Sequence, residues 1–167
     1  MKNNQKAHNF SLYNTLLTLS RNLFFYKKIK LPDTFKTRIY LMFMHFSIMM
    51  IAKKKKNGKF NQKYYDYLFF NIENNLRELG FGDVSVNKKM KDLNKVLYDI
   101  LIKIESKKNN KKSFEIDNKL IFKYFNDLNS SENQRYLDFQ SYFTNFFKFC
   151  FELPLDNMVR DAINFKI

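Results

Sequence analysis

The side chains that most often carry catalysis are scarce in this chain and far apart in the sequence. There are two histidines, His8 and His45, and one cysteine, Cys150. Catalysis needs a nucleophile with its base, paired carboxylates in a cleft, or a cluster of metal ligands. Cys150 stands between two phenylalanines, and we expect it to be a small buried hydrophobic side chain. The sequence therefore predicts no catalytic residue, metal site, cofactor or small-molecule substrate, and the protein is not expected to be an enzyme.

A second group of polar residues surrounds a bend marked by glycine. The chain has only three glycines, and two of them are Gly80 and Gly82. Glycine is needed where φ is positive or where no Cβ fits, so both positions predict a sharp connection between two elements. The charged residues Arg77, Glu78 and Asp83 flank this bend. They are expected either to tie neighbouring helices through charge-assisted hydrogen bonds or to frame a surface that receives a partner.

The net charge of +14 is concentrated in the first two fifths of the chain. Residues 1–63 carry fourteen basic side chains and one acidic side chain, whereas residues 64–167 are nearly balanced. An anionic partner is therefore expected to meet the N-terminal part. The candidate anion-binding residues form two clusters: Lys27, Lys28 and Lys30, and Lys53, Lys54, Lys55 and Lys56. If both clusters lie at one end of the molecule, they would bind an anionic membrane surface or ribosomal RNA.

Helical periodicity and the absence of strand-like alternation predict an all-α protein. We expect a disordered tail over residues 1–10 and one domain over residues 11–167, built as a bundle of six to seven helices. The expected helices cover residues 11–24, 34–52, 62–79, 84–104, 115–125 and 132–151, with a short last helix from Pro154. The expected caps are Asp33 or Thr34, Asp83 or Ser85, and Ser131, with Gly80 ending the third helix.

Residues 39–52 are almost entirely apolar. This segment is shorter than the ~20 residues that a membrane span requires. We therefore interpret it as a buried central helix, with a re-entrant or interfacial element as the alternative. His45 within it is expected to be a satisfied core or interface histidine rather than a metal ligand.

Two segments together resemble the ubiquinol–cytochrome c chaperone family, which comprises assembly factors of the respiratory cytochrome bc1 complex. The first is Asp33-Thr34-Phe35-Lys36-Thr37-Arg38, continuing to His45. The second is Leu76-Arg77-Glu78-Leu79-Gly80-Phe81-Gly82-Asp83, followed by Val86, Lys88 and Met90. The resemblance covers about residues 12–100, and the last third of the chain agrees only in its helical character.

The resemblance implies a non-enzymatic chaperone that binds newly made cytochrome b, another bc1 subunit or a small partner protein. It implies a location in the bacterial cytoplasm, peripheral on the inner membrane, with the mitochondrial matrix as the alternative. The candidate client-binding residues are Arg38, His45, Arg77, Glu78, Gly80, Gly82 and Asp83. Two other interpretations stay open: a basic helical module that binds nucleic acid or the ribosome, and a stable accessory subunit of a membrane complex.

Overall fold

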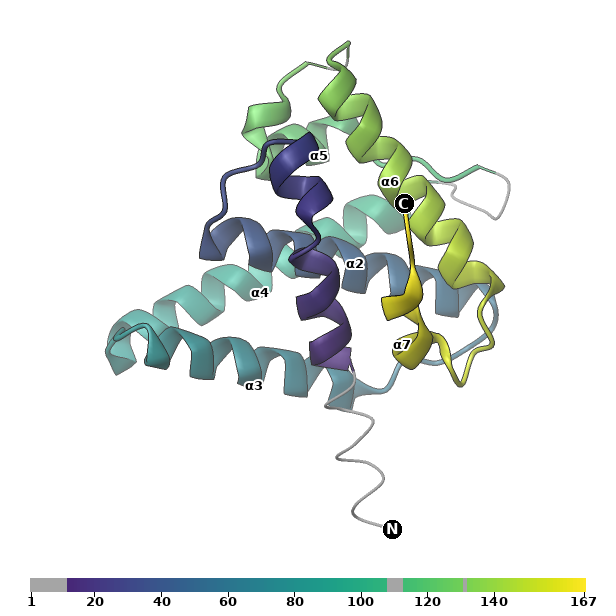
Figure 1. The fold of residues 1–167 in the computed structure, drawn as a ribbon. Coiled ribbons are helices and arrows are strands. Elements are labelled where there is room, and N and C mark those ends of the chain that lie inside the picture. The colour runs from purple at the N-terminus through teal and green to yellow at the C-terminus, as the bar shows by residue number, and fades with distance from the viewer. Residues whose placement is uncertain (1–11, 108–112, 131) are drawn as a thin grey trace.

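The computed structural model describes residues 12–107, 113–130 and 132–167 (Figure 1). These residues form helices and no strands, which confirms the all-α class. The first helix covers residues 12–20. It is followed by η1 (Phe24–Lys28), α2 (Phe35–Lys55), α3 (Gln62–Glu78), α4 (Asp83–Ser106), α5 (Asn118–Tyr124), η2 (Asn126–Leu128), α6 (Gln134–Glu152), α7 (Met158–Asp161) and η3 (Ala162–Asn164). The predicted tail over residues 1–10 and the predicted cap Ser131 lie outside the described residues.

The first helix ends four residues earlier than predicted. The side chain of Asn22 accepts a hydrogen bond from the N–H of Phe24 (2.9 Å), and η1, a π-helical turn, begins there. An asparagine side chain bonded to the backbone two residues on competes with continuation of an α-helix. Arg21 therefore lies in a turn between two helical segments rather than inside a helix.

α2 is the central helix of the molecule. Thirteen of its 21 residues are buried, and it packs against both α4 and α6 (Figure 1). It begins after Thr34, whose side chain accepts a hydrogen bond from the N–H of Thr37 (3.2 Å), and it ends at Lys55, three residues later than predicted. None of the helices in the described ranges has the length and apolar character needed to cross a membrane. The interpretation of residues 39–52 as a buried central helix is confirmed.

α3 and α4 pack against each other and are joined by the bend at Gly80 (Figure 1). The N–H of Gly80 donates to the carbonyl of Arg77 (2.9 Å), and the N–H of Phe81 donates to the carbonyl of Leu76 (3.3 Å). Gly80 has a φ of +92°, so the pair of bonds is a Schellman motif with glycine in the left-handed conformation. The prediction that Gly80 ends the third helix is confirmed.

Gly82 differs from what the sequence predicted, whereas Gly58, for which nothing was predicted, is tightly enclosed. Gly82 has a φ of −75° and open space where a Cβ would lie, so the backbone does not require glycine there. Gly82 is itself the N-cap of α4 and offers no side chain, so neither Asp83 nor Ser85 caps this helix as predicted. Gly58 is the position without room, because a Cβ there would lie 2.8 Å from a methyl carbon of Leu155.

The C-terminal helices begin at positions set by local hydrogen bonds. α6 is capped by Asn133, whose side chain accepts a hydrogen bond from the N–H of Arg135 (2.9 Å). α7 begins at Met158 rather than at Pro154, because residues 154–157 form a turn closed by the N–H of Asn157 and the carbonyl of Pro154 (3.0 Å). The aromatic side chains on the inner face of α6 lie in the same hydrophobic core as α2.

Candidate binding groove

The first turns of α2 face the α3–α4 bend across an open groove. Its larger compartment has a volume of about 650 Å³ and apolar walls made by Phe35, Ile39, Leu76, Leu79, Phe81 and Leu93. A smaller compartment of about 360 Å³ adjoins it and shares three of its lining residues, Phe35, Ile39 and Leu79. The two segments that stood out in the sequence, residues 33–45 and 76–91, therefore form opposite walls of one groove.

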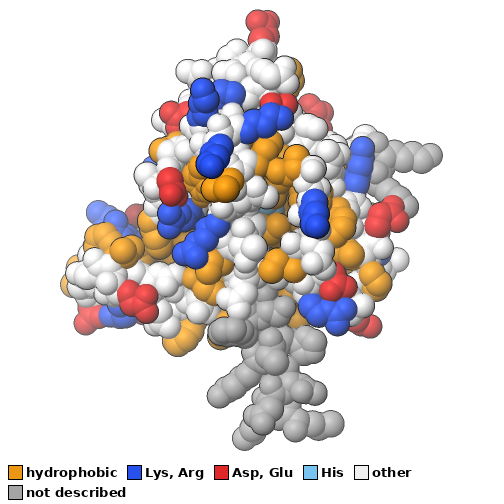
Figure 2. Space-filling model, in the orientation of Figure 1, with side chains coloured by type: hydrophobic (Ala, Val, Ile, Leu, Met, Phe, Trp, Pro, Cys, Tyr) orange, Lys and Arg blue, Asp and Glu red, His pale blue; other side chains and the backbone are white. Residues whose placement is uncertain are grey.

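Large apolar side chains are exposed at the bend that borders this groove. The exposed fractions are 58% for Leu79, 38% for Phe81 and 86% for Val84. The ammonium group of Lys89 lies 4.6 Å from the centre of the Phe81 ring. Figure 2 shows apolar side chains on the surface of this end of the molecule. Exposed apolar side chains gathered beside a groove are typical of a surface that binds another molecule.

Arg77 ties the end of α3 to the start of α4. Its guanidinium lies 2.8 Å from a carboxylate oxygen of Glu73 and forms an ion pair with Asp83. The hydrogen bonds to Asp83 and to Glu73 raise the pKa of Arg77 further above its usual value. This is the tie between helices that the sequence suggested, and it holds the bend in one geometry.

Arg38 and Glu78 have different surroundings from Arg77. Arg38 pairs with Asp33 (2.6 Å), a residue just before its own helix, so this ion pair joins no second helix. Glu78 is exposed, and its carboxylate has no hydrogen bond or ion pair with the described residues. Both side chains line the smaller compartment of the groove. The predicted tie between helices is therefore absent at Glu78.

His45 lies in the core and not on the groove. Its side chain is fully buried, its Nδ1 donates to the carbonyl of Leu41 (2.7 Å), and its Nε2 accepts from the hydroxyl of Tyr142 (2.9 Å). Burial lowers the pKa of His45 to about 3, against a smaller opposing effect of the bond to Leu41. His45, a candidate client-binding residue from the sequence, therefore does not line the groove, and the interpretation of His45 as a satisfied core histidine is confirmed.

The two lysine clusters lie far from each other. Lys28 pairs with Asp138 near the start of α6 (3.3 Å), whereas Lys56 donates to the carbonyl of Leu153, just after α6 ends. At 1.5 Å per residue, these two points of α6 are separated by roughly 22 Å. Figure 2 shows basic side chains scattered among acidic and apolar ones on the visible face. The two clusters therefore do not lie at one end of the molecule, which was the condition for a single basic surface.

Several of the candidate lysines have structural partners. Lys54 forms an ion pair with Glu105, and the ammonium group of Lys53 lies 5.5 Å from the centre of the Phe60 ring. Lys53, Lys54 and Lys55 occupy the last turn of α2, where cations are favoured by the carbonyl end of the helix dipole. Lys55 is exposed, as are Lys27 and Lys30 of the other cluster.

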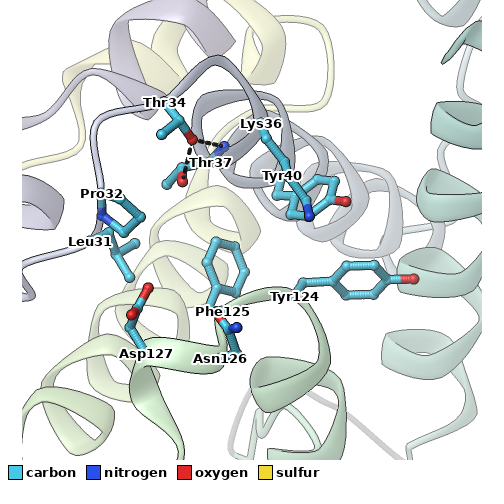
Figure 3. Close-up of a pocket in the computed structure, with 10 residues that line it drawn as sticks. All are labelled: Leu31, Pro32, Thr34, Lys36, Thr37, Tyr40, Tyr124, Phe125, Asn126 and Asp127. Atoms are coloured by element: carbon cyan, nitrogen blue, oxygen red, sulfur yellow. Dashed lines mark hydrogen bonds between the residues drawn. The ribbon is translucent and has the colours of Figure 1, made fainter.

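A smaller cavity of about 190 Å³ lies at another side of the α2 start (Figure 3). Thr34, Thr37 and Tyr40 line it from α2, and Phe125 and Asp127 line it from the segment that follows α5 (Figure 3). It shares Thr34, Lys36 and Tyr40 with the larger compartment of the groove. The start of α2 therefore lies between this smaller cavity and the larger compartment of the groove.

Most residues that line the groove were not in the set predicted from the sequence. Phe35, Ile39, Leu79 and Leu93 fit a helical apolar periodicity, which predicts burial and does not distinguish a core from a groove floor. Arg21 also lines the smaller compartment. The rarity of arginine in this lysine-rich chain is a signal that points to it.

Comparison with known proteins identifies the family of the part of the chain that contains the groove. A family model described as Ubiquinol-cytochrome C chaperone matches residues 27–128, and the groove walls between α2 and the α3–α4 bend lie within this range. The match continues through α5 and η2, beyond the limit near residue 100 expected from the sequence. No curated protein and no solved structure matched the chain. Because the family model covers more than half of its length, the chain belongs to the ubiquinol–cytochrome c chaperone family.

Proposed function

We propose that the protein is a non-enzymatic assembly chaperone of the cytochrome bc1 complex. In this proposal, the groove between α2 and the α3–α4 bend receives an apolar segment of newly made cytochrome b or of another bc1 subunit. Family membership supports the role in bc1 assembly. The structural observation that carries the proposal is the groove itself, with its apolar floor and the exposed side chains of Leu79, Phe81 and Val84 beside it. Such a surface can shield apolar side chains from water until they are inserted or assembled.

The surroundings of the most reactive described side chains support binding rather than catalysis. Cys150 is buried, and its burial raises the pKa of the thiol far above its usual value. His45 is buried and neutral. Neither of them lines the two compartments of the groove. The groove therefore offers its ligand apolar contact and surface charges, which suits a protein segment.

The proposed location is the bacterial cytoplasm, peripheral on the inner membrane, with the mitochondrial matrix as the alternative. Exposed lysines would hold the protein at anionic lipid, each contributing roughly 1 kcal/mol close to the surface. The same lysines would serve equally for contact with ribosomal RNA, which would place the chaperone where its client emerges. A nucleic-acid-binding role is the second candidate function, because the chain has a net charge of +14 and exposed lysines lie at the end of α2.

Deletion of the gene followed by complementation tests the proposal. Loss of the protein should lower the amount of assembled bc1 complex while other respiratory complexes persist. A Leu79→Glu variant should fail to restore bc1, whereas Phe70→Glu should restore it, because Phe70 is equally exposed (58%) but does not line the groove.

Normal bc1 levels in the deletion strain would contradict the proposed function. Full restoration by Leu79→Glu would contradict the assignment to the groove. A stable accessory subunit, the third interpretation, would instead remain bound in equal amount to the purified mature complex.

A further inference from the structure

Arg21 differs from the other arginines of the chain in its lack of partners. Each of the other four arginine side chains bonds to a carboxylate or a carbonyl: Arg38 to Asp33, Arg77 to Glu73 and Asp83, Arg135 to the carbonyls of Ile29 and Lys30, and Arg160 to Asp161. The side chain of Arg21 has no hydrogen bond or ion pair with the described residues. Its five N–H donors are therefore open to a ligand.

The position of Arg21 connects this open guanidinium to the groove. It stands in the turn after the first helix and lines the smaller compartment, together with the polar groups of Tyr13, Asn75, Glu78 and Arg38. The floor of this compartment is apolar and consists of Leu17, Phe35, Ile39, Met42 and Leu79. Tyr13 and Asn75 are already bonded to each other (2.5 Å), and Arg38 is held by Asp33. Among the described cations at this compartment, Arg21 is the one available to a ligand.

A side chain of the opposite charge lines the same compartment. Glu78 belongs to the last turn of α3, and no ion pair joins it to Arg21. An anionic group entering the compartment is attracted to Arg21 and repelled by Glu78. The two unpaired charges thus give the groove a polarity that would orient its ligand.

We propose that the smaller compartment is a carboxylate-binding site for an apolar protein segment that carries an acidic side chain. Arg21 would donate two parallel N–H bonds to that carboxylate while the apolar part of the segment covers Leu17 and Met42. A planar guanidinium matches a carboxylate in a way that an ammonium group does not, which gives a physical reason for arginine in a chain with 25 lysines. The inference rests on the proposed function and specifies the chemistry of the client segment.

The test uses two synthetic, fluorescently labelled helical peptides rich in leucine and alanine. They differ only at one central position, which is Glu in one peptide and Gln in the other. Binding to the purified full-length protein is measured by fluorescence anisotropy. We expect roughly fivefold tighter binding of the Glu peptide, the effect of one well-formed ion pair at a partly exposed site. An Arg21→Gln variant should bind both peptides equally, while Arg160→Gln, whose arginine pairs with its neighbour Asp161, should keep the preference.

Each other outcome has a distinct meaning. Equal binding of the two peptides to the wild type overturns the carboxylate site and leaves the apolar groove intact. A preference that survives in Arg21→Gln also overturns it, because another group would then bind the carboxylate. Failure of both peptides to bind the wild type contradicts the proposed function of the groove as well as this inference.

Discussion

Gly80 and Gly82 are separated by one residue but have opposite backbone requirements. Gly80 has a φ of +92°, a conformation that costs an L-residue about 1 kcal/mol, so Gly80→Ser should destabilise the fold by about that amount. Gly82→Ser should stabilise it by about 0.5 kcal/mol, because the new hydroxyl would cap α4 and the unfolded chain would lose freedom. Urea denaturation of the two variants measures both effects. Equal destabilisation by both substitutions would contradict the assigned backbone geometry.

His45 should make the stability of the protein depend on pH. Burial lowers its pKa in the folded state to about 3, whereas the unfolded chain takes up a proton near pH 6.5. The stabilising effect of neutral His45 is therefore complete above pH 6.5 and decreases as the pH falls toward 3. Between pH 7 and pH 5, the free energy of unfolding should fall by about 2 kcal/mol through this residue. Urea denaturation at both pH values should show this loss in the wild type and not in His45→Gln, and an equal loss in both proteins would refute the assignment.

At the scale of the helices, α2 contains a buried hydroxyl without a hydrogen bond among the described residues. The Ser47 Oγ is buried without a hydrogen-bond partner among the described residues. Ser47→Ala should therefore leave the free energy of unfolding unchanged or raise it by up to about 1 kcal/mol. The same substitution at Ser20, whose buried hydroxyl donates to the carbonyl of Leu17 (2.9 Å), should lower it by about 1 kcal/mol. Thermal melting distinguishes the two cases, and a clear loss of stability in Ser47→Ala would show that the hydroxyl has a partner.

The ends of the helices were predictable where a single local sequence signal determines them. They were less predictable where two local signals favour different structures. The periodicity of residues 62–79 and the glycine after them were enough to predict α3 and its end at Gly80. The sequence did not predict the end of the first helix, because the Asn22 side chain competes there with an otherwise continuous apolar pattern. The groove could not be predicted from the sequence either. Whether Phe35 and Leu79 pack against each other or border an open space depends on the angle between two helices, which periodicity does not contain.

At the scale of the whole molecule, α2 separates the groove from the basic loop that follows the helix. Its 21 residues span roughly 30 Å, with Phe35 in the groove wall and Lys55 at the other end. This distance is several times the screening length of about 8 Å at physiological salt. Binding of an anionic surface at the lysine end should therefore leave the affinity of the groove unchanged. If both proposals hold, the client segment would be received on the side of the protein that faces away from the lipid or the ribosome.

Vesicle binding with two matched pairs of substitutions tests this arrangement. The Lys55→Gln/Lys59→Gln and Lys27→Gln/Lys30→Gln variants each remove two exposed lysines, and both leave the partnered Lys28, Lys54 and Lys56 in place. The first variant should bind anionic phosphatidylglycerol vesicles roughly tenfold more weakly than wild type, because residues 53–63 contain six lysines and no acidic residue. Neither variant should change the affinity for the apolar peptides.

If only the second variant loses vesicle binding, the membrane-binding end would be the start of α2, beside the groove. If the wild-type protein binds anionic vesicles at no salt concentration, membrane docking is contradicted. Ribosomal RNA would then remain as the partner of the lysines.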